Sequence, residues 1–76
     1  MFDLNKLQEK LEIAFPESEV LVQNPRKDGE HFIVHITSTL FKDKSRIEQH
    51  KMVYKVLEEE LSQGLHSLSL KLKVKE

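Results

Sequence analysis

The chain of 76 residues contains neither cysteine nor tryptophan. Without cysteine it can form no disulfide, and it supplies no thiolate for zinc, for an iron–sulfur cluster or for redox catalysis. An iron–sulfur cluster bound here would need thiolates from another molecule. The four histidines are then the side chains to examine as ligands of a transition metal.

Long apolar runs and an excess of one charge are missing as well. No stretch free of charged residues approaches the roughly 20 residues that cross a bilayer. The formal net charge is −1, which argues against a strong nucleic-acid binder by overall charge. The segment MFDLNKLQEK has neither a basic leader nor an apolar core, so we expect no signal peptide and a cytoplasmic protein. A chain this short predicts one domain, residues 1–76.

Glycine and proline are rare, at two each, and they mark the ends and turns of the predicted elements. Residues 3–15 predict a helix that Asp3 caps and Pro16 ends. Pro25 and Gly29 lie in a predicted loop, and Gly64 ends a second helix. The apolar stripe of the first helix is Leu4, Leu7, Leu11, Ala14 and Phe15.

Three segments predict strands. Residues 18–23 and 31–39 are rich in β-branched side chains and are separated by the loop 24–30, which predicts a hairpin. The segment GLHSLSLKL, residues 64–72, alternates leucines with polar side chains, which is the period of a half-buried strand.

The second helix is predicted from the capping box of Ser45 and Glu48 to about Gln63. At 100° per residue, His50 falls in the middle of its buried stripe, where we expect it to pack and donate a hydrogen bond to a carbonyl. The other members of the stripe are Ile47, Val53, Tyr54, Leu57 and Leu61. The predicted core of the domain is Leu7, Leu11, Phe32, Val34, Ile36, Tyr54, Leu57, Leu68 and Leu70.

The order helix, strand, strand, helix, strand predicts a small α/β (α+β) domain. The connection between the second and third strands, about 27 residues, is long enough for a crossover, so these strands would be parallel neighbours. We therefore expect a three-stranded mixed sheet with both helices on one face. Parallel strands start at the same end of a sheet, so this topology brings His31, His66 and the loop 24–30 to one rim.

The segment VHITSTLFKDKSRIEQHKMVYKVLEEEL, followed by LHSLSL, resembles the BolA family. The matching features are the strand that ends in Ser38, the connector with Phe41 and Ser45, and the run RIEQHKMVY. DGEHF also looks like the family's usual start of the second strand. The resemblance covers residues 28–70 closely and the first helix loosely. It implies a KH-like fold of the second topological type, in agreement with the element order.

The resemblance also implies a function. BolA-like proteins pair with monothiol glutaredoxins and share a [2Fe–2S] cluster, in iron–sulfur trafficking or iron regulation. The glutaredoxin and glutathione supply thiolates, and the LHSLSL position, here His66, supplies an imidazole. The family takes a second ligand, histidine or cysteine, from the loop before the second strand. Residues 24–30 hold neither, so His31 is the nearest candidate.

Each histidine also has a plainer interpretation. From periodicity alone, His66 is an inert residue at the start of a strand and His31 is an exposed strand residue. His35 lies four residues beyond His31, roughly 13 Å away at 3.3 Å per residue, so these two cannot bind one metal. We expect His35 on the open face of the sheet.

Basic residues gather around the connector and the start of the second helix. We expect them to dock a protein partner or nucleic-acid phosphates, with a plain solvated surface as the alternative. The second candidate function is a DNA-binding transcriptional regulator, although the GXXG loop of KH domains is missing. No nucleophile arrangement or phosphate loop is present, so we expect no enzyme. A homodimer, and action through protein contacts without a metal, stay open. The basic residues are Lys42, Lys44, Arg46 and Lys51.

Overall fold

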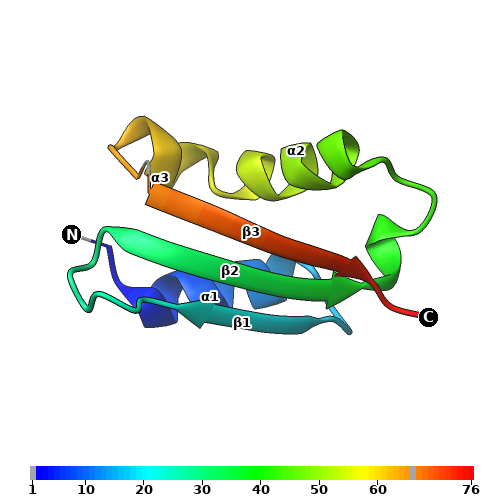
Figure 1. The fold of residues 1–76 in the computed structure, drawn as a ribbon, viewed down its shortest axis with the longest axis horizontal. Coiled ribbons are helices and arrows are strands. Elements are labelled where there is room, and N and C mark those ends of the chain that lie inside the picture. The colour runs from blue at the N-terminus through cyan, green and yellow to red at the C-terminus, as the bar shows by residue number, and fades with distance from the viewer. Residues whose placement is uncertain (1, 66) are drawn as a thin grey trace.

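The computed structural model describes residues 2–65 and 67–76. A three-stranded sheet has the order β1-β2-β3, with β1 antiparallel and β3 parallel to β2 (Figure 1). The predicted element order and the mixed sheet are confirmed. Along the chain the elements are α1 (Leu4–Ala14), β1 (Glu19–Gln23), β2 (His31–Ser38), the 3-10 turn η1 (Thr39–Phe41), α2 (Arg46–Val56), α3 (Glu58–Ser62) and β3 (Ser67–Val74).

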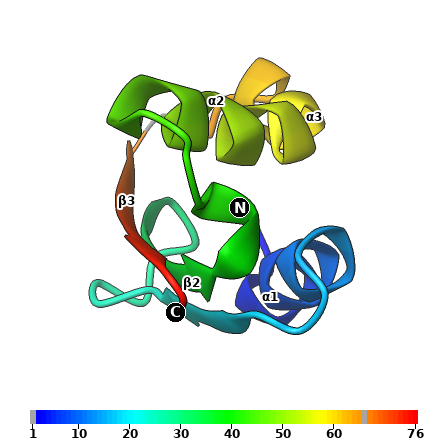
Figure 2. The same ribbon diagram turned by 90° about the vertical axis from the view of Figure 1, so that its right-hand side faces the viewer.

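All the helices lie on one side of the curved sheet, as predicted (Figure 2). The core fills the space between the two layers, and Ser38, also fully buried, bonds to the Ser18 hydroxyl at 2.7 Å. None of the described helices is long and apolar enough to cross a membrane. The buried apolar residues are Leu7, Leu11, Phe15, Val22, Phe32, Val34, Ile36, Phe41, Val53, Leu57 and Leu65.

Helix α1 begins and ends close to the predicted positions. The Asp3 carboxylate accepts the backbone N–H groups of Asn5 and Lys6, at 2.8 and 3.3 Å, as an N-cap does. Ala14 was predicted on the buried stripe but is exposed. It is the last residue of the helix, and the buried place at this end is filled by Phe15, whose ring centroid lies 5.5 Å from that of Phe41.

The second helix differs from its prediction in two ways. It breaks at Leu57, which separates α2 from α3. Its buried face is also rotated: Ile47 and Tyr54, predicted to be buried, are 69% and 40% exposed. Apolar side chains lie on both sides of Val53 around the helix. The side that carries Met52 and Val56 is the one that packs against the core. The prediction of Tyr54 as a core residue is therefore wrong, and His50 is half-buried with its ring edge-on to Tyr54.

The two edges of the sheet differ. At β1, Gln8 of α1 takes up the outer hydrogen-bonding groups: its Nε2 donates to the Val20 carbonyl at 2.6 Å, and its Oε1 accepts from the Val22 N–H at 2.7 Å. At the other edge, the predicted alternation of β3 is confirmed. Leu68 and Leu70 are only half-buried, because among the described residues β2 is the one strand that pairs with β3.

Candidate functional site

The loop 24–30 between β1 and β2 is closely bonded. The Asn24 carbonyl accepts from the Lys27 N–H at 3.0 Å, and the Gly29 carbonyl accepts from the Phe2 N–H at 2.9 Å. Gly29 has φ 69°, a left-handed conformation that glycine adopts without strain. Asn24 Oδ1 is buried and has no hydrogen-bond partner among the described residues. The loop thus fixes the position of the residues that follow it.

Asp28 binds the first residues of β2 with both carboxylate oxygens. Oδ1 accepts the backbone N–H groups of Glu30 and His31, at 2.9 and 3.0 Å. Oδ2 lies 2.6 Å from Nδ1 of His31. These backbone bonds, Glu30 first, lower the pKa of Asp28 to about 2 from its usual 3.8, against the opposing effect of burial. Asp28 is therefore an anion at neutral pH and an acceptor only.

The contacts of His31 assign its tautomer. Nδ1 faces the Asp28 carboxylate, which can only accept, so Nδ1 carries the proton. Nε2 lies 3.4 Å from Nη1 of Arg26, a guanidinium that can only donate, so Nε2 presents its lone pair. A histidine that binds a metal through Nε2 needs this tautomer, and a carboxylate on its other nitrogen fixes the orientation of the ring.

Asp28, Glu30 and His31 also form a group of potential metal donors. One ligand atom from each lies within 4.8 Å of the others. Both oxygens of Asp28 already accept hydrogen bonds, and through Oδ2 this carboxylate orients the ring of His31. The side chain of His31 is 36% exposed, which leaves it open to a ligand from another molecule.

The sheet register confirms that β2 and β3 start at the same end of the sheet, as the topology predicts. His31 pairs with Ser67, the residue next to position 66 in the sequence, at the start of both parallel strands. His66 itself lies outside the described residues, so its role as a ligand stays a prediction. His35 pairs with Lys71 further along, and its Nε2 lies 2.9 Å from Oε1 of Gln23. The expectation that His35 lies on the open face is met.

The four basic residues predicted for docking are all exposed. Arg46 lines a groove of about 320 Å³ between α2 and β3, and Lys42 lines a second hollow by the C-terminal residues of β3. Lys44 and Lys51 line neither. The groove brings Arg46 together with two lysines of β3, Lys71 and Lys73, which the sequence reasoning did not single out.

The comparison with known proteins decides the family. Residues 7–76 match the sequence profile of the family described as BolA-like protein. The chain belongs to the BolA family. The BolA fold also recurs in solved structures: the BolA domain of SufE1 from Arabidopsis thaliana has a TM-score of 0.82 with 32% identity, covering 92% of this chain and 88% of that one. BolA1 from the same plant has a TM-score of 0.83 with 32% identity, covering 93% and 89%.

Curated BolA relatives differ in length. The uncharacterized protein RP812 of Rickettsia prowazekii is 35% identical over 87% of this chain and 86% of its own length. SufE-like protein 1 of Arabidopsis thaliana is 46% identical over 57% of this chain, which is 12% of that protein. The chloroplastic BOLA1 is 32% identical over 87% of this chain and 49% of its own length. The cytoplasmic location expected for this BolA chain stays a prediction.

Proposed function

We propose that this BolA chain is an adaptor that binds a monothiol glutaredoxin and shares with it a [2Fe–2S] cluster, for which the chain supplies imidazole ligands. The observation that carries the proposal is the contact of Asp28 with Nδ1 of His31 at 2.6 Å. It leaves the Nε2 lone pair, which Arg26 Nη1 approaches to 3.4 Å, as the metal-binding atom of an accessible ring at the rim of the sheet. This donor fits a cluster iron, because histidine is an accepted iron ligand beside thiolates.

Two histidines of the chain would hold the cluster. His31 is supported by its geometry, and His66 by the LHSLSL motif of the family. Ser67, which follows His66, pairs with His31 across β2 and β3, and this supports ligands from the same end of the sheet. Histidine in place of cysteine raises the reduction potential of such a cluster. The missing thiolates would come from the glutaredoxin and glutathione.

The experiment is co-expression with a monothiol glutaredoxin, followed by visible absorption and circular dichroism of the purified complex. We expect a coloured heterodimer whose spectrum differs from that of the glutaredoxin homodimer. His66→Ala should lose this spectrum and keep some contact with the apo-glutaredoxin, whereas His35→Ala should behave as the wild type. An unaltered cluster spectrum in His66→Ala would reject the ligand assignment.

The second candidate function is a DNA-binding regulator. The exposed Lys42, Lys44 and Arg46 around the start of α2 favour it; the net charge of −1 and the lack of a GXXG loop oppose it. Salt separates the two functions. Contacts with phosphates release counterions, so DNA binding should fall steeply between low and physiological salt, and cluster sharing should not follow that slope.

A further inference from the structure

The free edge of β3 is open, unlike the edge of β1. Gln8 bonds to the outer backbone groups of Val20 and Val22 and so closes β1. In the part of the chain that the structure describes, no strand and no side chain bonds to the outer side of β3. An unpaired strand edge is a template for another extended chain.

A single hydrogen bond shows which residues face this edge. The Lys75 N–H donates to the Ser38 carbonyl of β2 at 3.0 Å, so the backbone groups of Lys75 point toward β2. Along a strand, the N–H and C=O groups of successive residues point alternately toward its two edges, just as the side chains point alternately toward the two faces of the sheet. The N–H and C=O groups of Leu70 and Leu72 therefore point outward, toward the free edge.

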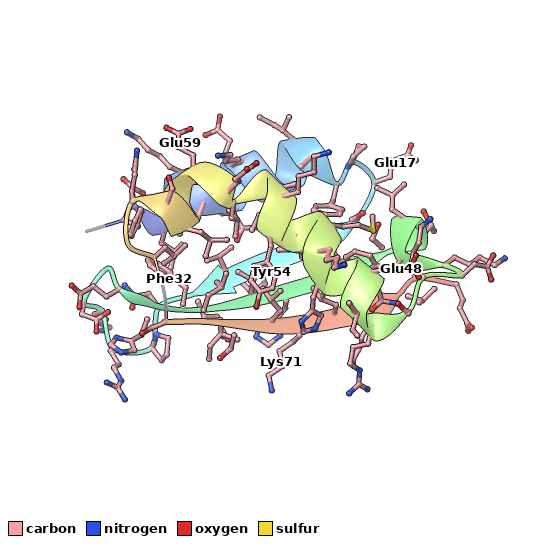
Figure 3. All side chains as sticks on the ribbon, turned by 90° about the horizontal axis from the view of Figure 1, so that it is seen from above. Glu17, Phe32, Glu48, Tyr54, Glu59 and Lys71 are labelled. Carbon is pink, nitrogen blue, oxygen red and sulfur yellow. The ribbon has the colours of Figure 1, made fainter. Side chains whose placement is uncertain are left out.

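The groove of about 320 Å³ runs beside these two leucines. Arg46, Gln49 and His50 of α2 form one wall, and Leu70 to Lys73 of β3 form the other. Tyr54, 40% exposed, extends the α2 wall on the side toward β3, and Lys71 projects from β3 away from the helices (Figure 3). A helix and an open strand edge that flank a groove form the arrangement in which peptides bind by strand addition.

The charge of the groove indicates its occupant. Of the seven residues that line it, Arg46, Lys71 and Lys73 are cations and none is acidic. Lysines along an edge strand disfavour pairing with a second copy of the same strand, because the like charges would meet. The chemistry therefore favours an acidic strand over a second molecule of this chain.

We propose that the groove between α2 and β3 binds an extended acidic segment of a partner protein, which pairs with β3 as a fourth strand. The segment bonds to the outward N–H and C=O groups of Leu70 and Leu72. Its apolar side chains pack toward these leucines and α2, and its carboxylates lie beside Lys71 and Lys73. This site is separate from the His31 rim and needs no cluster.

The probe is a fluorescein-labelled peptide of sequence VEVEVEV, titrated with the metal-free chain and followed by anisotropy and by amide NMR shifts. Two N-methylated versions of the peptide are compared. One carries methyl groups on every second amide, and the other carries them on the remaining amides. We expect one version to lose binding and the other to bind as the parent does, because only alternate N–H groups face β3. If both versions bind as the parent, the contact is electrostatic only and the proposal is overturned.

Charge reversal tests the groove itself. Lys71→Glu/Lys73→Glu should weaken peptide binding by about tenfold or more, since it turns two attractions into repulsions. The control is Lys6→Glu/Lys27→Glu, which makes the same charge change on exposed residues outside the groove and should bind within about twofold of the wild type, as distant surface charges are screened. Equal weakening by both variants, or displacement of the peptide by an oligothymidine that shifts the same amides, would overturn strand addition.

Discussion

Asp28 contacts His31 at two points, with Oδ1 on the backbone N–H at 3.0 Å and Oδ2 on the ring Nδ1 at 2.6 Å. One carboxylate therefore sets both the start of β2 and the orientation of the ring. A residue that fixes a ligand in this way should affect both the stability of the loop and the behaviour of the metal site.

The first prediction concerns acid stability. The pKa of Asp28 is lowered to about 2 from 3.8, so its contribution to stability is present above pH 3.8 and is lost as the pH falls toward 2. Asp28→Asn removes this titration, so its melting temperature should fall less steeply than that of the wild type between pH 4 and 2. Thermal denaturation over this range measures it, with Glu30→Gln as the control. If the melting temperatures of Asp28→Asn and the wild type fell in parallel with pH, the stabilising role of the Asp28 carboxylate would be contradicted.

The second prediction concerns His31. His31→Ala should give a heterodimer with the glutaredoxin whose cluster is lost faster, because one imidazole is missing. Asp28→Ala should have a smaller effect in the same direction, because the ring is kept but no longer oriented; such outer partners typically contribute about 10- to 100-fold in metal affinity. The rate of bleaching in the presence of a chelator measures both. His35→Ala serves as the control, and a cluster equally stable in all three variants would exclude His31.

The third prediction tests the face that α2 buries. Leu57→Ala should lower the free energy of unfolding by roughly 2–5 kcal/mol, because Leu57 is fully buried and its removal leaves a cavity. Ile47→Ala should cost less than about 1 kcal/mol, because Ile47 is 69% exposed. Urea denaturation compares the two variants. A larger loss of unfolding free energy for Ile47→Ala would mean that α2 buries the face predicted from the sequence, with Ile47 in the core.

The fourth prediction separates docking from folding. Lys42, Lys44 and Arg46 lie around the start of α2, where positive charge slightly opposes the helix dipole. Replacing all three with serine should leave the melting temperature nearly unchanged and weaken binding to the glutaredoxin. Affinity is measured by titration calorimetry with the apo-glutaredoxin. Unchanged affinity for both the glutaredoxin and DNA would end the docking hypothesis.

The fifth prediction concerns the closed edge of the sheet. Gln8→Ala removes both side-chain hydrogen bonds to Val20 and Val22, and each bond contributes about 0.5–1.5 kcal/mol. The variant should therefore unfold at lower urea, and the amide protons of β1 should exchange faster. Glu9→Ala, an exposed neighbour on α1, is the control. Identical exchange at Val22 in both variants would show that Gln8 does not protect the edge.

Much of the fold could be predicted because its elements have clear periods. The alternation of β2 and β3 and the caps of α1 and α2 are local signals, and the length of the crossover gave the parallel pair. The face of α2 could not be predicted, because apolar residues lie on both sides of Val53. The sequence offers Tyr54 and Ile47 on one side and Met52 and Val56 on the other, and only the packed core selects between them.

The site was predictable in part. Topology brought His31 to the rim, and the family resemblance suggested its role. Asp28 was missed because an Asp-Gly pair typically indicates a turn, although an acid three residues before a histidine was a signal available in the sequence. Gln8 was missed because a polar residue on a helix usually faces water, and its partners lie 12 and 14 residues away. Contacts of this kind depend on tertiary structure and leave no periodic pattern.

The inequality of the two sheet edges also limits how these molecules can assemble. A fibre that grows by adding sheet to sheet needs an acceptor edge at each end of every subunit, so that each addition recreates the site for the next. Gln8 occupies one of those ends, so two copies of this chain that paired through β3 would present a closed β1 edge on each side. Copies of the domain therefore cannot add to one another without limit, and the exposed strand can serve recognition without continued polymerisation.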